Sequence, residues 1–153
     1  MSLKKVVTSA QWVMSAYFAW DKADTMVNSL GNTVDLGLTN AGGAGVFTNG
    51  IFKVIKMPKG AIVVGGAVQA TETFDTAGYD VKVGILGTLD KYLASTDVKT
   101  AGAETPLVPT GVVTDGEDIY LSFSSDDACS ATGKGILRVD YIIDQRATEN
   151  NPN

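Results

Sequence analysis

The chain of 153 residues contains no histidine and a single cysteine, Cys129. Without histidine, the Ser-His-Asp and Cys-His catalytic arrangements cannot form, and the commonest metal ligand and general base is missing. One cysteine cannot form an intrachain disulfide, which is typical of a protein made in a reducing cytosol. It also cannot supply a zinc site of the paired-cysteine kind. We therefore expect no catalytic residue, no metal and no cofactor, and interpret Cys129 as a small structural residue beside a turn.

Long apolar runs and basic clusters are missing too. Residues 1–10 contain no apolar run of the signal-peptide kind, and the apolar stretch 61–68 is interrupted by glycine and too short to span a bilayer. The net charge of −5 disfavours nucleic acid as a partner, because an acidic surface repels phosphate. Residues 42–45 are rich in glycine but precede no clear helix, so a flexible loop explains them better than a phosphate site. We expect a soluble, unexported protein that binds neither membranes nor nucleic acid.

What remains is the composition of one ordered domain. Hydrophobic residues make up 44% of the chain and charged residues only 19%, which is too apolar for a disordered protein. A chain of this length buries roughly 68–70% of its unfolded surface on folding, so it can form a real core. Seventeen glycines predict many turns.

Alternation of apolar and polar residues in short runs predicts β-strands. The pattern is clearest over residues 79–85, 119–124 and 136–143. Residues 50–56 and 61–71 are less regular, and Gly65-Gly66 in the second of these predicts a bulge or a close approach of two backbones. About seven to nine strands separated by turns predict an antiparallel, all-β sandwich. The only helix we expect is short, over residues 88–94, where Leu89, Tyr92 and Leu93 share one face.

Residues 12–20 alternate as well, but both of their faces are largely apolar. We interpret this run as a strand, although helical spacing also fits Val13, Tyr17 and Trp20. A run with two apolar faces can dock on a partner, and tryptophan and tyrosine are favoured interface residues. We therefore propose four residues as contacts with another protein subunit, with the chain's own core as the alternative: Trp12, Tyr17, Phe18 and Trp20.

The acidic residues form no recognisable site. Residues 115–118 and 126–127 carry carboxylates that calcium could use, but their spacing does not match an EF-hand loop, and aspartate and glycine are common in turns. Glycoside hydrolysis needs two carboxylates flanking the bond. No carboxylate lies between Trp12 and Trp20, and nothing singles out an acid–nucleophile pair. We expect that the protein is not an enzyme.

Three segments resemble the head decoration (capsid cement) proteins of tailed bacteriophages. The first, residues 52–63, is a strand, a Pro58-Lys59-Gly60 turn and a second strand. The second, residues 79–102, follows Tyr79-Asp80-Val81-Lys82 with the expected short helix. The third spans residues 119–142. The resemblance covers residues 36–141, about two-thirds of the chain.

This resemblance implies a jelly-roll-like β-sandwich that forms a homotrimer. It implies a virion protein, made in the host cytoplasm, that sits on the outer surface of the capsid and cements neighbouring subunits of the major capsid protein. It carries over no catalytic, cofactor or contact residue. With the partners it implies, the proposed contacts of Trp12, Tyr17, Phe18 and Trp20 would be trimer or capsid contacts. Residues 36–146 would form the sandwich, residues 1–35 an N-terminal segment docked on its own core or on a partner, and residues 147–153 a polar tail. Alternatives are another virion component, such as a head fibre base or tail accessory protein, and a carbohydrate-binding β-sandwich module.

Overall fold

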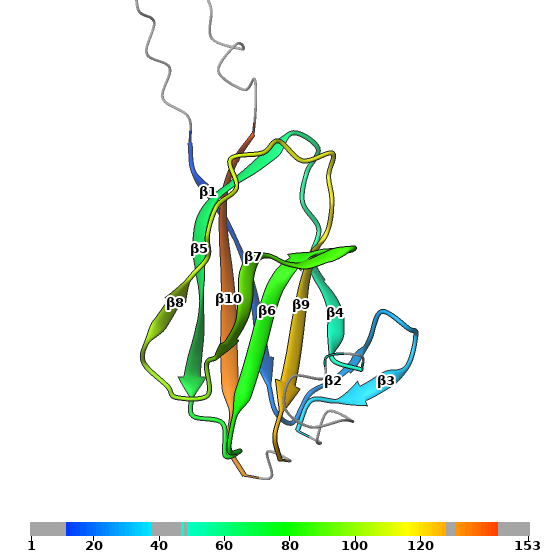
Figure 1. Cartoon of the computed structure of the whole chain (residues 1–153), viewed down its shortest axis with the longest axis vertical. Coiled ribbons are helices and arrows are strands. Elements are labelled where there is room, and N and C mark those ends of the chain that lie inside the picture. Colours follow the sequence, from blue (N-terminus) through cyan, green and yellow to red (C-terminus); the bar gives the residue numbers. More distant parts are fainter. Residues whose placement is uncertain (1–11, 38–46, 48, 128–130, 144–153) are drawn as a thin grey trace, which may run out of the picture.

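Ten strands and no helix occur in the part of the chain that the computed structural model describes, which is residues 12–37, 47, 49–127 and 131–143. Two four-stranded antiparallel sheets face each other, and a small hairpin projects beside them (Figure 1). The predicted all-β antiparallel sandwich is thereby confirmed. Cys129 and the glycine-rich residues 42–45 lie outside the described residues.

The strands of each sheet follow a non-sequential order. The first sheet has the order β1 (Met14–Asp21), β10 (Lys134–Ile143), β5 (Ala61–Glu72), β8 (Glu104–Pro106). The second sheet has the order β4 (Ile51–Ile55), β9 (Ile119–Ser125), β6 (Tyr79–Ile85), β7 (Thr88–Asp97). The hairpin consists of β2 (Thr25–Val27) and β3 (Thr33–Asp35).

The pairing of the eight sheet strands is nested along the sequence. The first pairs with the last, β1 with β10, and the pairs β4 with β9, β5 with β8 and β6 with β7 follow inward. The chain therefore behaves like one long hairpin rolled into two layers. This places the two ends of the described chain next to each other in the first sheet.

The expected alternation appears directly in β6. Tyr79, Val81 and Val83 are fully buried, whereas Asp80 and Lys82 point to the other face. The runs 119–124 and 136–143 form β9 and β10, and the less regular runs form β4 and β5. The strand interpretation of residues 12–20 is confirmed as well, since β1 occupies Met14–Asp21.

The short helix predicted over residues 88–94 is wrong, because these residues begin strand β7. The register between β6 and β7 is broken twice, between Val81 and Val83 and between Val83 and Ile85. Extra residues in a bulged strand change which face the following side chains occupy. Two adjacent side chains, Tyr92 and Leu93, are therefore both buried. Together with Leu89 they imitate the spacing of a helix face.

Both features predicted from the Gly65-Gly66 pair, a bulge and a close approach of two backbones, occur in the structure. The register of β5 against β10 shifts between Asp140 and Tyr141, opposite this pair. Gly66 has a φ of 128°, and a Cβ atom there would overlap the carbonyl oxygen of Arg138. Glycine is required because the two backbones approach too closely for a side chain.

The core between the sheets contains a row of stacked aromatic rings drawn from both layers. Phe18 and Trp20 come from β1, and Tyr79 from β6 on the opposite sheet. Neighbouring ring centroids along the row are 3.8–6.5 Å apart, in the order Phe18, Trp20, Phe74, Tyr79, Phe123, Phe52. Rings packed in this way add directional contacts to the burial of their large apolar area.

Strand β1 docks on the chain's own sheet. It pairs with β10 over its whole length, from Met14 opposite Tyr141 to Asp21 opposite Lys134. β1 is thus an integral strand of the first sheet, whereas β2 and β3, among the described strands, pair only with each other. The division at residue 35 stays a prediction, and the polar tail 147–153 lies outside the described residues.

Candidate functional site

Exposed apolar side chains gather at one end of the first sheet. Ten large hydrophobic residues are exposed in the described part of the chain, and seven of them lie on segments that reach this end. We call these seven the apolar surface: Trp12, Val13, Tyr17, Val64, Val108, Val112, Val113. The segments that carry them converge where β1 begins, β5 begins and β10 ends (Figure 1). Apolar patches of this kind on soluble proteins commonly mark interaction sites.

The strand register explains why distant segments contribute to one surface. Ile142 of β10 lies opposite Ile62 of β5, and Ile62 forms an isolated bridge with Val113. Both isoleucines are half-buried. The segment after β8 is held in place because the amide of Leu107 donates to the carbonyl of Gly66.

The four proposed contact residues lie in two different environments. Trp12 is 84% exposed and Tyr17 62% exposed, so both belong to the apolar surface. Phe18 is half-buried and packs against the core, and Trp20 is only 4% exposed within it. For Trp20 the structure therefore favours the alternative of a core residue. Trp12 and Tyr17 remain proposed contacts.

Strand β1 is at the edge of its sheet, and in the described residues only β10 pairs with it. Exposed edges are usually protected by short strands, charges or bulges. β1 has eight residues, an unbroken register with β10, and one charged residue, Asp21, at its far end. Its edge is therefore suited to pairing with another chain.

A polar ladder flanks Tyr17 on the outer face of the first sheet. The hydroxyl of Ser15 donates to the Oδ1 atom of Asp140 at 2.6 Å. Arg138, directly opposite Tyr17, lies 3.3 Å from the same oxygen and 3.6 Å from Glu104. The apolar surface thus has a polar border, as protein interfaces commonly do.

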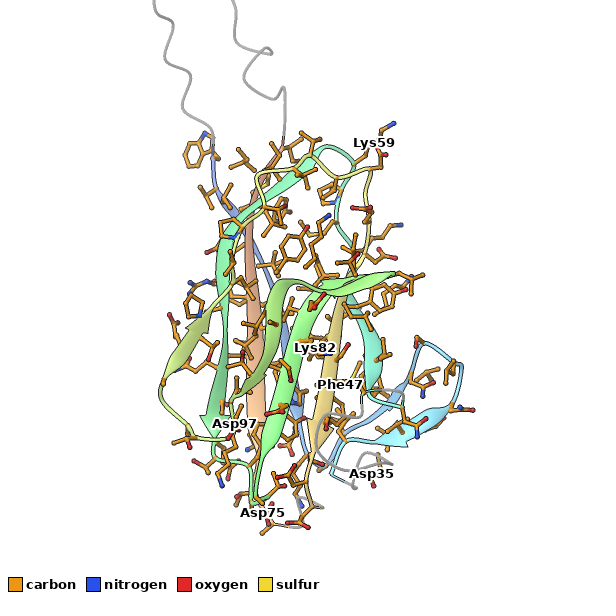
Figure 2. The ribbon with its side chains drawn as sticks, in the orientation of Figure 1. Asp35, Phe47, Lys59, Asp75, Lys82 and Asp97 are labelled. Atoms are coloured by element: carbon orange, nitrogen blue, oxygen red, sulfur yellow. The ribbon has the colours of Figure 1, made fainter. Side chains whose placement is uncertain are left out.

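The second sheet carries charged groups rather than an apolar patch. Lys82 lies 4.2 Å from the ring centroid of Phe47, over the outer face of this sheet (Figure 2). Partial burial, followed by the charges of Asp97 and Asp126, raises the pKa of Asp80 above its ordinary value.

The acidic turns hold ion pairs. Lys53 lies 3.0 Å from Asp118, and Lys91 lies 3.8 Å from Glu117. No cluster of three or more histidine, cysteine, aspartate or glutamate residues that could hold a metal occurs in the described ranges. In the same ranges, no helix is long and apolar enough to cross a membrane.

Sequence reasoning missed most of the apolar surface. Val64, Val108, Val112 and Val113 lie in a bulged strand or in an irregular segment, where alternation gives no signal. The run Leu107-Val108-Pro109 and the pair Val112-Val113 could have drawn attention as apolar residues in a loop rich in turn formers. Their association with Trp12 depends on the nested pairing, which the sequence does not display.

No protein-family model matches the chain, and no curated protein matches it in sequence. Solved structures that resemble its fold include chains of two phage capsids. A chain of the cyanophage Pam1 capsid asymmetric unit matches with a TM-score of 0.58 and 18% identity, covering 94% of this chain and 97% of that one. A chain of the acidic stable capsid structure of Helicobacter pylori bacteriophage KHP30 matches with a TM-score of 0.50 and 19% identity, covering 90% of each chain. At these identities the likeness establishes a shared fold.

Proposed function

We propose that this chain is a structural protein of a tailed-phage virion and not an enzyme. The observation that carries the proposal is the likeness to chains of two phage capsids, which extends over nearly the whole of each chain. The matched chains are therefore also small proteins built from one such sandwich. The likeness to capsid chains agrees with the resemblance of three sequence segments to decoration proteins.

The finer part of the proposal is a homotrimer on the outside of the capsid that cements neighbouring major capsid protein subunits. Its support is the nested pairing of strands in two four-stranded sheets, which is the pairing that an eight-stranded jelly roll requires. Jelly rolls recur in viral capsid proteins. Trp12 and Tyr17, with the open β1 edge, provide a surface for contact with another subunit.

Cementing would act by mass action. A protein that binds the assembled lattice and not the free subunits stabilises the lattice by its binding free energy. A trimer engages several lattice subunits at once, so one modest contact repeated by symmetry gains from avidity. No catalytic group is needed for this role.

The first test is the mass of the purified protein by light scattering after size exclusion. We expect a trimer that then binds expanded phage capsids of the virus that encodes it. A protein that stays monomeric at high concentration contradicts the trimer. A trimer that never sediments with capsids contradicts cementing.

Variants can locate the contact. We expect Trp12→Ser and Tyr17→Ser to lower the oligomeric mass or capsid binding while the midpoint of thermal unfolding changes little, because both side chains are exposed in the monomer. Leu30→Ser is the matched control, since Leu30 is 62% exposed but lies on the β2–β3 hairpin. If all three variants behave like the unmodified protein, the apolar surface is not the contact.

A further inference from the structure

A pocket of about 230 Å³ opens beside the turn between β6 and β7. Its walls come from that turn, from β9 and from the segment that leads into β9. The lining residues are Ile85, Leu86, Gly116, Glu117, Asp118 and Tyr120. It is smaller than the roughly 300–1,000 Å³ of typical pockets for drug-sized ligands, so it suits a single ring rather than an extended peptide.

The pocket combines apolar and hydrogen-bonding walls. Ile85, Leu86 and Tyr120 supply aliphatic and aromatic surface, and Leu86 is 69% exposed there. Glu117 and Asp118 supply carboxylate oxygens. A ligand that fits both walls has an apolar face and several hydroxyl groups.

The charges around the pocket are balanced. Asp118 is paired with Lys53, and Glu117 with Lys91. Each of the two carboxylates in the lining is therefore neutralised by a lysine. Sugar hydroxyls both donate and accept hydrogen bonds, so they can use such pairs without displacing an ion. A simple cation or anion finds no excess of opposite charge.

The wall carrying the carboxylates is fixed in position. Gly116 has a φ of 86° and packs against the turn before β5, where a Cβ atom would lie 3.3 Å from the amide nitrogen of Lys59. Thr114 exchanges backbone hydrogen bonds with that turn, accepting from Gly60 and donating to Ala61. A preformed wall binds a ligand without the cost of ordering a loop.

We propose that this pocket binds one neutral sugar residue, with the ring packed on Tyr120 and its hydroxyls bonded to Glu117 and Asp118. The inference is independent of the trimer and of capsid binding. A virion protein with such a site would attach weakly to glycans, and many copies on one particle would strengthen the attachment by avidity.

The test is a titration of the ¹⁵N-labelled protein with the methyl glycosides of glucose, galactose, mannose and N-acetylglucosamine, followed by amide chemical shifts. We expect one or more of them to shift the amides of residues 85–87 and 116–120, with a dissociation constant of about 1 mM. No shift with any of the four at about 50 mM, well above that constant, overturns the proposal.

Variants and a charged probe make the test specific. We expect Tyr120→Leu to weaken binding roughly three- to tenfold, the range that an aromatic contact provides. Asp118→Ala should weaken it further, while Leu30→Ser leaves it unchanged. Unchanged binding by both pocket variants overturns the assignment. Shifts of the same amides by lysine methyl ester but by none of the glycosides would identify a cation pocket and also overturn it.

Discussion

The indole nitrogen of Trp20 donates a hydrogen bond to the hydroxyl of Tyr79 at 3.1 Å, which joins β1 of one sheet to β6 of the other. Both side chains are buried, and the ring of Phe74 stacks between them in the aromatic row. Gly135 lies directly opposite Trp20 on β10, and a Cβ atom there would overlap the indole. The edge strand is thus fixed to the core by one polar contact inside an apolar stack.

Tyr79→Phe should lower the free energy of unfolding by about 1–3 kcal/mol, because the indole N–H of Trp20 loses its acceptor in the core. Urea unfolding monitored by tryptophan fluorescence measures this loss. A double-mutant cycle with Trp20→Phe should give a coupling energy of about 0.5 kcal/mol or more. Tyr17→Phe, at an exposed tyrosine, is the control and should leave the stability unchanged. Additive effects of the two core substitutions would contradict the role of the hydrogen bond.

Gly66→Ala should destabilise the protein more than Gly31→Ala. Both glycines have positive φ values, 128° and 83°, so both substitutions carry backbone strain of order 1 kcal/mol. Only at Gly66 does the new methyl group overlap a carbonyl oxygen, that of Arg138, whereas nothing lies within 4 Å at Gly31. We expect a difference of about 1–3 kcal/mol, the usual cost of overpacking, in chemical denaturation. Equal losses would show that the strands separate easily at the bulge.

The sequence predicts the strands that are regular and buried on one face. In β6 and β10, one side chain in two enters the core, so alternation is visible in the residues themselves. The predicted helix is wrong because Tyr92 and Leu93 are both buried at a break in the register of β7 against β6. The residues of β7 alone cannot reveal this break, since it depends on the partner strand. Strands β2, β3 and β8 have three residues each, too few for a period to appear.

The candidate site was predictable only in part for the same reason. The alternation over residues 12–20 places Trp12 and Trp20 on one face, but their surroundings differ. Trp20 lies opposite Gly135 inside the sandwich, whereas Trp12 precedes the first paired residue, Met14. Which end of a strand extends past its neighbours is a property of the register and not of the strand's own residues.

Asn28→Ala should loosen the β2–β3 hairpin. The Asn28 side chain is 5% exposed, and its Oδ1 atom accepts from the amides of Leu30 and Asn32 while its Nδ2 atom donates to the carbonyl of Asn49. Removing these bonds should cost about 1–3 kcal/mol and speed hydrogen exchange at Leu30. Asn32→Ala is the matched control, because the bonds of Asn32 described here use its backbone only. Equal exchange rates in both variants would contradict this anchor.

Asp80 should contribute to the stability of the fold in mild acid and lose that contribution at neutral pH. It lies directly opposite Asp97 in the β6–β7 pair, near the end of the sandwich that carries Asp75 (Figure 2). Partial burial comes first among the causes that raise its pKa above 3.8, followed by the charges of Asp97 and Asp126, while a hydrogen bond from Ser95 opposes them. The carboxylates of Asp97 and Asp126 face it from β7 and from the end of β9, and Lys82 lies on its own strand.

A raised pKa means that the folded state binds the proton more tightly than the unfolded state. The free energy of unfolding therefore gains from Asp80 as the pH falls through its raised pKa towards 3.8, and loses that gain as the pH rises again. Asp80→Asn removes the charge and should stabilise the protein at pH 7, by up to about 1 kcal/mol, the range of cross-strand pair energies. The difference between variant and unmodified protein should shrink as the pH approaches 4. Chemical denaturation at several pH values measures it, and a difference that stays constant or grows in acid would show that the fold does not raise the pKa of Asp80.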